Sequence, residues 1–184
     1  MEFRAHKTPI DGLLIIEPKL FTDERGYFME SYRKADFVGL GIEVDFVQDN
    51  QSRSCLGTLR GLHFQKTNPQ AKLVRALSGK VFDVAVDLRS GSPTFGKWHA
   101  VTLDADSKKQ FYIPAGFAHG FLALTDGAEF AYKCSAYYDA VDEGGIFFDD
   151  PEIGIDWPLQ QVGQPLLSDK DKRLPRLRDL GFSF

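Results

Sequence analysis

The stretch KVFDVAVDLRS, residues 80–90, has the clearest periodicity in the chain. Its apolar side chains recur at every second position, and polar or small side chains fill the positions between them. The first set is Phe82, Val84, Val86 and Leu88, and the second is Asp83, Ala85, Asp87 and Arg89. A period of two is typical of a β-strand with two distinct faces. The sequence therefore predicts a strand here, with one polar face.

Similar short runs of β-forming residues lie on both sides of this strand. Turn sequences separate them, such as SGSP at residues 90–93 and TDGAE at residues 125–129. Many short strands at close intervals indicate an all-β sandwich or barrel. The other predicted strands lie within residues 11–21, 42–50, 71–79, 98–104, 109–116, 119–126 and 128–139.

Helical periodicity is confined to ESYRKADFVGL, residues 30–40. We expect Phe37, Val38 and Leu40 to face inward there and Gly41 to end the helix. A further turn is expected near residues 167–177. The chain of 184 residues is long enough for one sizeable core, so we expect one domain over residues 1–184. The tail from about residue 150 is rich in Pro, Asp and Leu and is expected to wrap around the barrel.

Composition and charge exclude several classes of protein. The net charge of -4 argues against broad binding to nucleic acid or to an anionic membrane. No uncharged run approaches the roughly 18 residues of a membrane span, and the first twelve residues carry charges where an export signal needs an apolar core. We therefore expect a cytoplasmic protein in which Cys55 and Cys134 remain thiols.

Two of the four histidines, His63 in RGLH and His119 in GFAHGF, lie in glycine-flanked stretches and are candidates for chemistry. From spacing alone, either one could instead be an ordinary core or surface residue. A small metal-binding β-barrel typically supplies an HxH pair, and His63 has no second histidine two residues on. We therefore expect no metal site.

Basic and aromatic residues provide two further observations. A pocket that gathered Arg25, Arg60, Lys72 and Lys170 would bind phosphate, although scattered basic residues usually only solvate a surface. Tyr132 and Tyr138 are six residues apart, which places both on one face of a continuous strand. At about 3.3 Å per residue their backbones would stand roughly 20 Å apart and could contact both ends of a ligand. A row of aromatic core residues is the alternative, since the chain has 16 Phe.

Nine stretches, in order, resemble one family, the dTDP-4-dehydrorhamnose 3,5-epimerases, which are metal-free nucleotide-sugar enzymes of the cupin type. The resemblance implies a cupin-type jelly roll with a few short helices, and an isomerase that needs no cofactor. The stretches are DERGYF, FVQDNQSRS, LRGLHFQ, KLVRALSGKVFDVAVDLR, SPTFGKW, IPAGFAHGFLAL, YKCSAYY, DWP and LSDKD.

The resemblance also implies roles for individual residues. His63 would be the base that removes a proton next to the substrate ketone, and Asp171 would orient it. Lys72 would lie near the oxyanion of the resulting enolate. Tyr132 would return a proton from the opposite face, and Tyr138 would stack on the thymine ring. The implied nucleotide-sugar contacts are Arg25, Glu30, Gln48, Asn50, Arg60, His119, Glu143 and Lys170.

The implied substrate is dTDP-4-dehydro-6-deoxy-D-glucose, which is converted to dTDP-4-dehydro-L-rhamnose in dTDP-L-rhamnose synthesis. The resemblance further implies a homodimer in which N-terminal strand residues cross between subunits. Three alternatives remain: a single-carbon epimerase on a related sugar, a non-catalytic sugar-nucleotide-binding barrel, and an iron-dependent cupin oxygenase. The combination of a base, an orienting carboxylate, a lysine and an acid argues against the second, and the missing HxH pair argues against the third.

The spacing of Arg60 and His63 conflicts with the implied position of both residues in one substrate pocket. They are an odd number of residues apart, so a regular strand would point them to opposite faces, yet both are assigned to one pocket. A glycine between them can seat a bulge that restores a common direction. The sequence therefore predicts an irregularity at Gly61.

Overall fold

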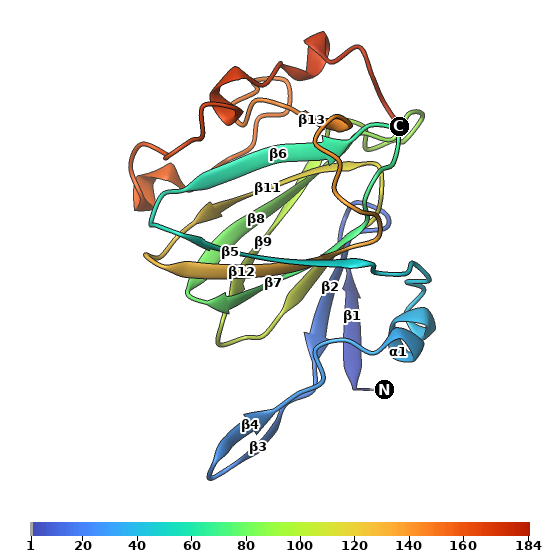
Figure 1. Cartoon of the computed structure of the whole chain (residues 1–184), viewed down its shortest axis with the longest axis vertical. Coiled ribbons are helices and arrows are strands. Elements are labelled where there is room, and N and C mark those ends of the chain that lie inside the picture. Colours follow the sequence, from blue (N-terminus) through green and yellow to red (C-terminus); the bar gives the residue numbers. More distant parts are fainter. Residues whose placement is uncertain (1) are drawn as a thin grey trace.

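The computed structural model describes residues 2–184 and contains two antiparallel β-sheets that face each other (Figure 1). The predicted all-β, cupin-type fold is confirmed. In order across the larger sheet lie β1 (Phe3–Lys7), β2 (Leu14–Pro18), β10 (Gln110–Ile113), β7 (Lys72–Ser78), β12 (Ala128–Cys134) and β5 (Gln48–Ser54). The smaller sheet contains β13 (Glu143–Gly145), β6 (Leu59–Gln65), β11 (Phe117–Ala123), β8 (Lys80–Asp87) and β9 (Trp98–Asp104).

Strand β8 has the two predicted faces, and both of them are buried. Val84 and Val86 pack in one apolar cluster with Trp157 of the C-terminal tail. Ala85 belongs to the core between the two sheets, and Asp83, two residues earlier on the same face, is completely buried. The polar face of this strand therefore lines the interior of the barrel, because the tail covers the apolar face.

The C-terminal tail lies along the outer side of the smaller sheet, as predicted (Figure 1). It contains the 3₁₀ turns η1 (Leu159–Gln161), η2 (Asp171–Arg173) and η3 (Leu177–Asp179). The ring of Phe182 stacks on Phe64 of β6 with the ring centroids 5.9 Å apart. The 3₁₀ turn η2 also contacts β6 directly.

Helix α1 (Lys34–Gly39) is shorter than the predicted range of 30–40, and Val38 is exposed instead of facing inward. A helix of fewer than two turns can bury only one face, and here Phe37 occupies it, in edge contact with Phe3. The helix ends at Gly41 as predicted. The N–H groups of Gly41 and Ile42 donate to the carbonyls of Val38 and Phe37, which is a Schellman motif with Gly41 at a φ of 84°.

Three predicted strands have different bounds in the structure. The strand expected within residues 42–50 is β5, Gln48–Ser54, and the one expected within residues 119–126 is β11, Phe117–Ala123. The strand expected within residues 128–139 is β12, which ends at Cys134. Strand β5 has the polar sequence QDNQSRS, so it lacks the apolar alternation that marks a strand. Strand β1 was not predicted, because only Phe3 of its five residues is buried.

The irregularity predicted at Gly61 is confirmed. Gly61 has a φ of 117°, the Gly61–Leu62 peptide bond is cis, and the pairing of β6 with β11 shifts register at this point. Leu59 and Leu62, three residues apart, consequently both pack towards the tail. Arg60 and His63 both border one hollow on the other side of the sheet.

A side chain does not fit at Gly61. A Cβ built there would lie 2.6 Å from the Cα of Gly120 and 2.7 Å from the carbonyl oxygen of His119. Both are backbone atoms that cannot rotate away, so the close contact of β6 with β11 requires glycine.

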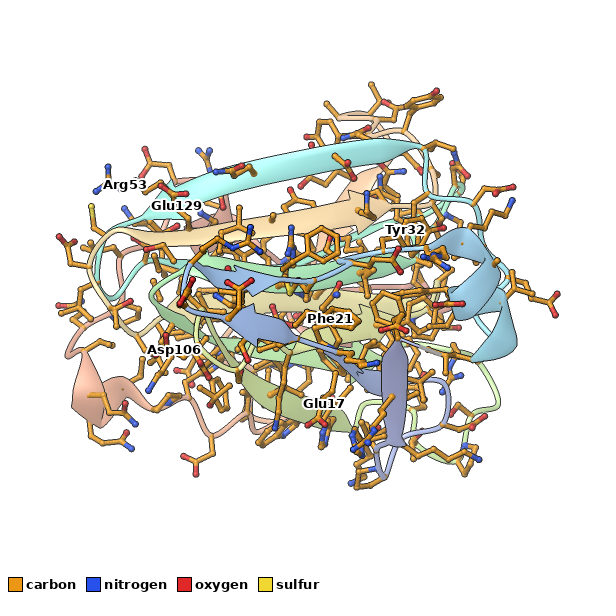
Figure 2. All side chains as sticks on the ribbon, turned by 90° about the horizontal axis from the view of Figure 1, so that it is seen from below. Glu17, Phe21, Tyr32, Arg53, Asp106 and Glu129 are labelled. Carbon is orange, nitrogen blue, oxygen red and sulfur yellow. The ribbon has the colours of Figure 1, made fainter. Side chains whose placement is uncertain are left out.

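A separate hairpin, β3 (Phe21–Asp23) and β4 (Gly26–Phe28), stands away from the two sheets (Figure 1). Figure 2 looks onto its Phe21 from below, and the aromatic rings of Phe21, Tyr27 and Phe28 are exposed. Within residues 2–184, no helix is long and apolar enough to cross a membrane.

Candidate active site

The candidate site is a cleft between the two sheets, formed by adjoining hollows of about 230 Å³ and 300 Å³. His63 of β6, Lys72 of β7 and Tyr132 of β12 border both hollows. The histidine comes from the smaller sheet, and the lysine and tyrosine come from the larger one. The cleft therefore has titratable groups on opposing walls.

His63 and Asp171 form a tight pair across 108 residues of sequence, with Nε2 and Oδ1 2.6 Å apart. Asp171 lies on η2 of the tail and is buried. Burial raises its pKa, but hydrogen bonds from His63 and Ser168 outweigh burial and hold the pKa of Asp171 below its ordinary value. A carboxylate only accepts hydrogen bonds, so Nε2 of His63 donates and the lone pair is on Nδ1.

Ser168 fixes the orientation of the Asp171 carboxylate. The Ser168 hydroxyl donates to Oδ2 of Asp171 at 2.8 Å, and the backbone N–H of Asp171 donates to the same hydroxyl oxygen at 3.0 Å. Oδ1 is consequently left for His63. This closed set of hydrogen bonds holds the imidazole in one tautomer and one orientation.

On the other side of the imidazole, Nδ1 of His63 lies 4.0 Å from Oε1 of Glu143. Oε2 of Glu143 accepts hydrogen bonds from the Tyr138 hydroxyl and from the Lys170 ammonium. Burial raises the pKa of Glu143, but these hydrogen bonds and the nearby His63 lower it below its usual value. The hydrogen bond to Glu143 raises the pKa of Tyr138 to about 12. The Glu143 carboxylate therefore lies next to three other predicted site residues, His63, Tyr138 and Lys170.

Lys72 and Tyr132 reach the cleft through strand alternation. Lys72 is two residues before Val74, which packs in the core between the sheets, so both point inward from β7. Burial lowers the pKa of Lys72, while the carboxylates of Asp83 and Glu143 raise it. Burial raises the pKa of Tyr132, which keeps the phenol protonated at neutral pH.

A base, a lysine and a phenol on opposing walls can move protons at a carbon between them. Residues 7–179 match the family model described as dTDP-4-dehydrorhamnose 3,5-epimerase. The chain belongs to this epimerase family. It is accordingly an isomerase.

Three known proteins illustrate the similarity of this epimerase to its relatives. The dTDP-4-dehydrorhamnose 3,5-epimerase of Methanothermobacter thermautotrophicus is 54% identical over 178 residues, which cover 97% of this chain and 96% of the relative. The structure of the Legionella pneumophila enzyme in complex with dTDP-4-keto-L-rhamnose has a TM-score of 0.92 at 51% identity, covering 96% of this chain and 93% of that one. A 3′-monoepimerase from Streptomyces bikiniensis in complex with dTDP-quinovose has a TM-score of 0.87 at 39% identity, covering 94% and 87%.

Tyr138 reaches the cleft of the epimerase by a different route from the predicted one. Strand β12 ends at Cys134, so the expectation that Tyr132 and Tyr138 stand on one face of a straight strand is wrong. The side-chain amide of Gln65 in β6 donates a hydrogen bond to the Tyr137 carbonyl and accepts one from the Asp139 N–H. These two hydrogen bonds hold residues 137–139 against the smaller sheet. Tyr132 and Tyr138 nevertheless border the same hollow.

The remaining predicted contacts divide into two groups. Arg25 lies at the turn of the hairpin, where it pairs with Asp23, and Glu30 pairs with Arg33. Neither of them borders the cleft of its own chain. The residues that do border it are Gln48, Asn50, Arg60, His119, Glu143 and Lys170.

Sequence reasoning missed Asp83, which lies behind the cleft. Both of its carboxylate oxygens contact Nε2 of His119, at 3.1 Å and 2.9 Å. The alternation in β8 placed Asp83 on the polar face, and that face proves to be the inside of the barrel. The sequence did contain a signal for this residue, namely an aspartate on the face of β8 that points into the barrel.

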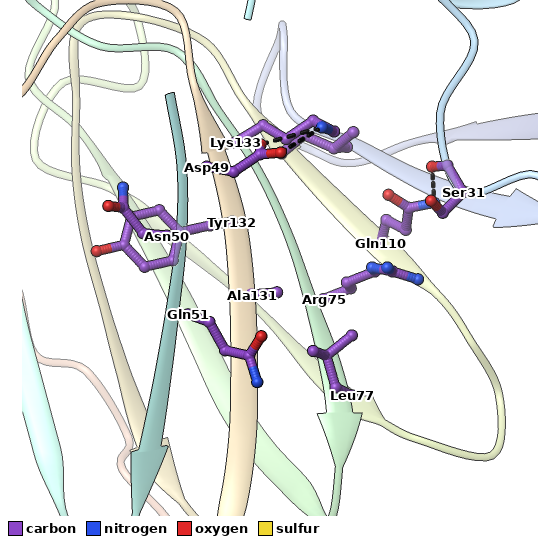
Figure 3. A pocket seen from close by; sticks show the side chains of 11 residues that line it. Ser31, Asp49, Asn50, Gln51, Arg75, Leu77, Gln110, Ala131, Tyr132 and Lys133 are labelled. Atoms are coloured by element: carbon purple, nitrogen blue, oxygen red, sulfur yellow. Dashed lines mark hydrogen bonds and ion pairs between the residues drawn. The ribbon is translucent and has the colours of Figure 1, made fainter. Parts of the chain in front are cut away.

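Another hollow lies on the outer face of the larger sheet of the epimerase (Figure 3). Its rim carries the Lys133–Asp49 ion pair, and the Gln110 amide donates to the Ser31 carbonyl. Neither His63 nor Asp171 borders this hollow. Among residues 2–184, no group of three or more His, Cys, Asp or Glu side chains is placed to hold a metal ion.

Proposed function

We propose that this epimerase acts on dTDP-4-dehydro-6-deoxy-D-glucose and inverts C3 and C5 to give dTDP-4-dehydro-L-rhamnose. The observation that carries the proposal is the position of the Asp171-bound His63 and of Tyr132 on opposite walls of one cleft. Inversion at carbon requires that a proton leaves from one face and that another arrives at the opposite face. A base and an acid on opposing sheets fit this requirement.

In the proposed mechanism, Nδ1 of His63 takes the proton next to the C4 ketone. The electron pair of the broken C–H bond moves towards the ketone oxygen and forms an enolate, while Asp171 stabilises the imidazolium. The ammonium group of Lys72 offsets the charge on the enolate oxygen. The Tyr132 hydroxyl then protonates the carbon from the other face, and solvent restores both side chains. The reaction moves only protons and is redox-neutral, so the proposal includes no cofactor.

The nucleotide is proposed to bind along the same two hollows. Arg60 and Lys170 border the same hollow, and their charges suit the diphosphate. Tyr138 is half exposed at the rim, where its ring can stack on the thymine, with Gln48 and Asn50 beside it. His119 and Glu143 complete the proposed contacts.

The test of the proposed function is proton exchange in deuterated water, followed by NMR at C3 and C5 of the proposed substrate. Deuterium at both carbons together with the L-configured product supports the 3,5-epimerase. The similarity to the Streptomyces bikiniensis 3′-monoepimerase makes single-carbon epimerisation the second candidate. Deuterium at one carbon alone would favour that candidate, and deuterium at neither would contradict both.

Tyr132→Phe is expected to separate proton exchange from inversion. The variant keeps His63 and its pair with Asp171, so C5 still exchanges, but the deuteron returns to the face from which it left. Formation of the L-configured product should fall by about 10²-fold or more, since one general acid contributes 10²–10⁴-fold. NMR reports exchange and configuration in the same sample.

The matched control for this variant is Tyr112→Phe. Tyr112 is buried, whereas Tyr132 is partly buried, and Tyr112 packs on the outer side of the larger sheet with Phe3 and Phe37. This control should keep both exchange and inversion. Inversion by Tyr132→Phe at the rate of the unmodified enzyme would contradict the role of Tyr132.

We infer that the active form is a homodimer in which the β3–β4 hairpin brings Arg25 and Glu30 to the cleft of the other subunit. The hairpin stands away from its own sheets and exposes three aromatic rings, which a second copy can bury (Figure 1). Arg25 is exposed, and its only ion-pair partner among the described residues is its neighbour Asp23.

Mixing two impaired variants tests this inference. Arg25→Ala and His63→Ala, refolded together, form heterodimers in which one of the two sites has both native side chains. Activity should return to about a quarter of the native value, because half of a random mixture is heterodimer. If Arg25 served its own subunit, neither site of a heterodimer would be intact and no activity would return.

We also infer a cytoplasmic location. Cys55 and Cys134 are both free thiols. A reducing compartment maintains thiols in that state.

A further inference from the structure

The buried pair of Asp83 on β8 and His119 on β11 has no part in the proton transfers proposed above. Asp83 is completely buried, and His119 is 7% exposed where its ring borders the cleft. The imidazole stacks on Phe130 at an interplanar angle of 17°, and its Nε2 contacts the carboxylate at 2.9 Å. A fully buried carboxyl group is costly unless a positive charge or hydrogen bonds compensate for it, so the arrangement calls for an explanation.

Lys72 is the third ionisable group in this part of the interior. Burial raises the pKa of Asp83 and lowers the pKa of both His119 and Lys72, so burial alone would leave all three neutral. The Asp83 carboxylate has the opposite effect from burial on the two bases, because it raises the pKa of His119 and of Lys72. A buried ammonium and a buried carboxylate therefore each favour the charged form of the other.

One arrangement of protons that satisfies these contacts places the extra proton on Lys72. Lys72 disfavours a charge on His119, and an amine is ordinarily a stronger base than an imidazole. His119 is then neutral and donates its Nε2 proton to the Asp83 carboxylate. The negative charge of Asp83 remains available to balance the ammonium of Lys72, which borders the same hollow as His119.

We propose that Asp83 is a positioning residue that acts together with His119 to keep Lys72 protonated beside the ketone of the substrate. This inference rests on the proposed role of Lys72 at the enolate oxygen. Glu143 is the other carboxylate near Lys72, but it already accepts hydrogen bonds from Lys170 and Tyr138. The titratable groups around Lys72 are Asp83 of β8, His119 of β11, His63 of β6, Glu143 of β13, and Tyr132 and Cys134 of β12.

Asp83→Asn tests the proposal, because the amide keeps the shape and can still accept the His119 hydrogen bond while the charge is lost. Without that charge Lys72 has a lower pKa, so the active ammonium form disappears at lower pH than in the native enzyme. We expect the alkaline limb of the kcat profile to move to lower pH by about one unit. Above that limb kcat should fall by about 10²-fold with little change in KM, as for the loss of one oxyanion donor.

Asp87→Asn is the matched control. Asp87 is also completely buried, lies four residues further along the same face of β8, and pairs with Arg89 outside the cleft. This control should lose stability but keep the native pH profile. If Asp83→Asn loses stability in the same way and its pH profile does not move, Asp83 is only structural and the proposal is wrong.

A readout independent of activity follows the charge of Lys72 directly. In protein with ¹³C-labelled lysine, the Lys72 Cε resonance is assigned by its absence in Lys72→Met and is then titrated in the native enzyme and in Asp83→Asn. An earlier loss of the proton in Asp83→Asn supports the proposal, and identical titrations overturn it. An earlier loss without any change in kcat would support the coupling but would contradict the proposed catalytic role of Lys72.

Discussion

Replacing His63 with alanine is expected to abolish deuterium incorporation at C3 and C5 and to lower kcat by about 10⁴-fold, the upper end of the range for general base catalysis. The large effect is expected because Nδ1 of His63 is the proposed acceptor for the proton at the reacting carbon. The Asp171 carboxylate is turned towards the imidazole and the Ser168 hydroxyl, so it is not placed to replace the base. Exchange is measured by NMR in deuterated water, and binding of dTDP is measured separately.

Two controls accompany the His63→Ala variant. His6→Ala removes an exposed histidine that pairs with Glu17 on the surface, and it should leave exchange unchanged. Free imidazole added to His63→Ala should restore part of the exchange, since it can occupy the space left by the side chain. Exchange by His63→Ala at the native rate would identify a different base, and Glu143, whose Oε1 lies 4.0 Å from Nδ1 of His63, would be the first candidate.

The second large effect is expected for Asp171→Asn, which changes the tautomer of His63 while preserving the shape of the site. Ser168 donates to Oδ2 of Asp171, so in the variant the amide oxygen remains on Ser168 and the NH₂ group faces Nε2 of His63. Nε2 must then accept a hydrogen bond, and the proton moves to Nδ1. An imidazole protonated at Nδ1 cannot accept a proton there, so kcat should fall by about 10³–10⁴-fold with little change in KM.

The neighbouring residue Asp169 supplies the control for Asp171→Asn. Asp169 pairs with Lys172 at the surface, and Asp169→Asn should retain activity. Thermal unfolding of both variants separates a loss of stability from a loss of catalysis. Native kcat in Asp171→Asn would show that His63 does not depend on this carboxylate for its tautomer.

Local patterns in the sequence predicted those parts of the fold that depend on local physics. The alternation of residues 80–90 identified β8, and Gly41 marked the end of α1. The irregularity at Gly61 was predicted from the odd spacing of Arg60 and His63 together with the family resemblance, which assigned both residues to one pocket. For β8 and α1, a few neighbouring residues determine the backbone geometry, so the sequence contains the necessary information.

Features that depend on distant residues could not be read in this way. Gln65 redirects the chain beyond Cys134, and no pattern within residues 128–139 indicates that contact. The partnership of Asp83 with His119 depends on the pairing of β8 with β11, which is a property of the assembled sheet. The pairing of His63 with Asp171 was expected only from the family resemblance, because 108 residues separate the two in sequence.

The position of Asp171 in the tail has a consequence for the order in which the enzyme is made. A ribosome finishes every strand of both sheets, through Gly145, before it adds Asp171. A nascent chain at that stage has His63, Lys72 and Tyr132 but lacks Asp171, the carboxylate that we propose sets the tautomer of His63. The C-terminal tail that carries Asp171 also covers the apolar face of β8. Packing of the tail on the smaller sheet therefore also brings Asp171 to His63. A chain that ends before this segment therefore contains every strand of both sheets but lacks the proposed partner of His63.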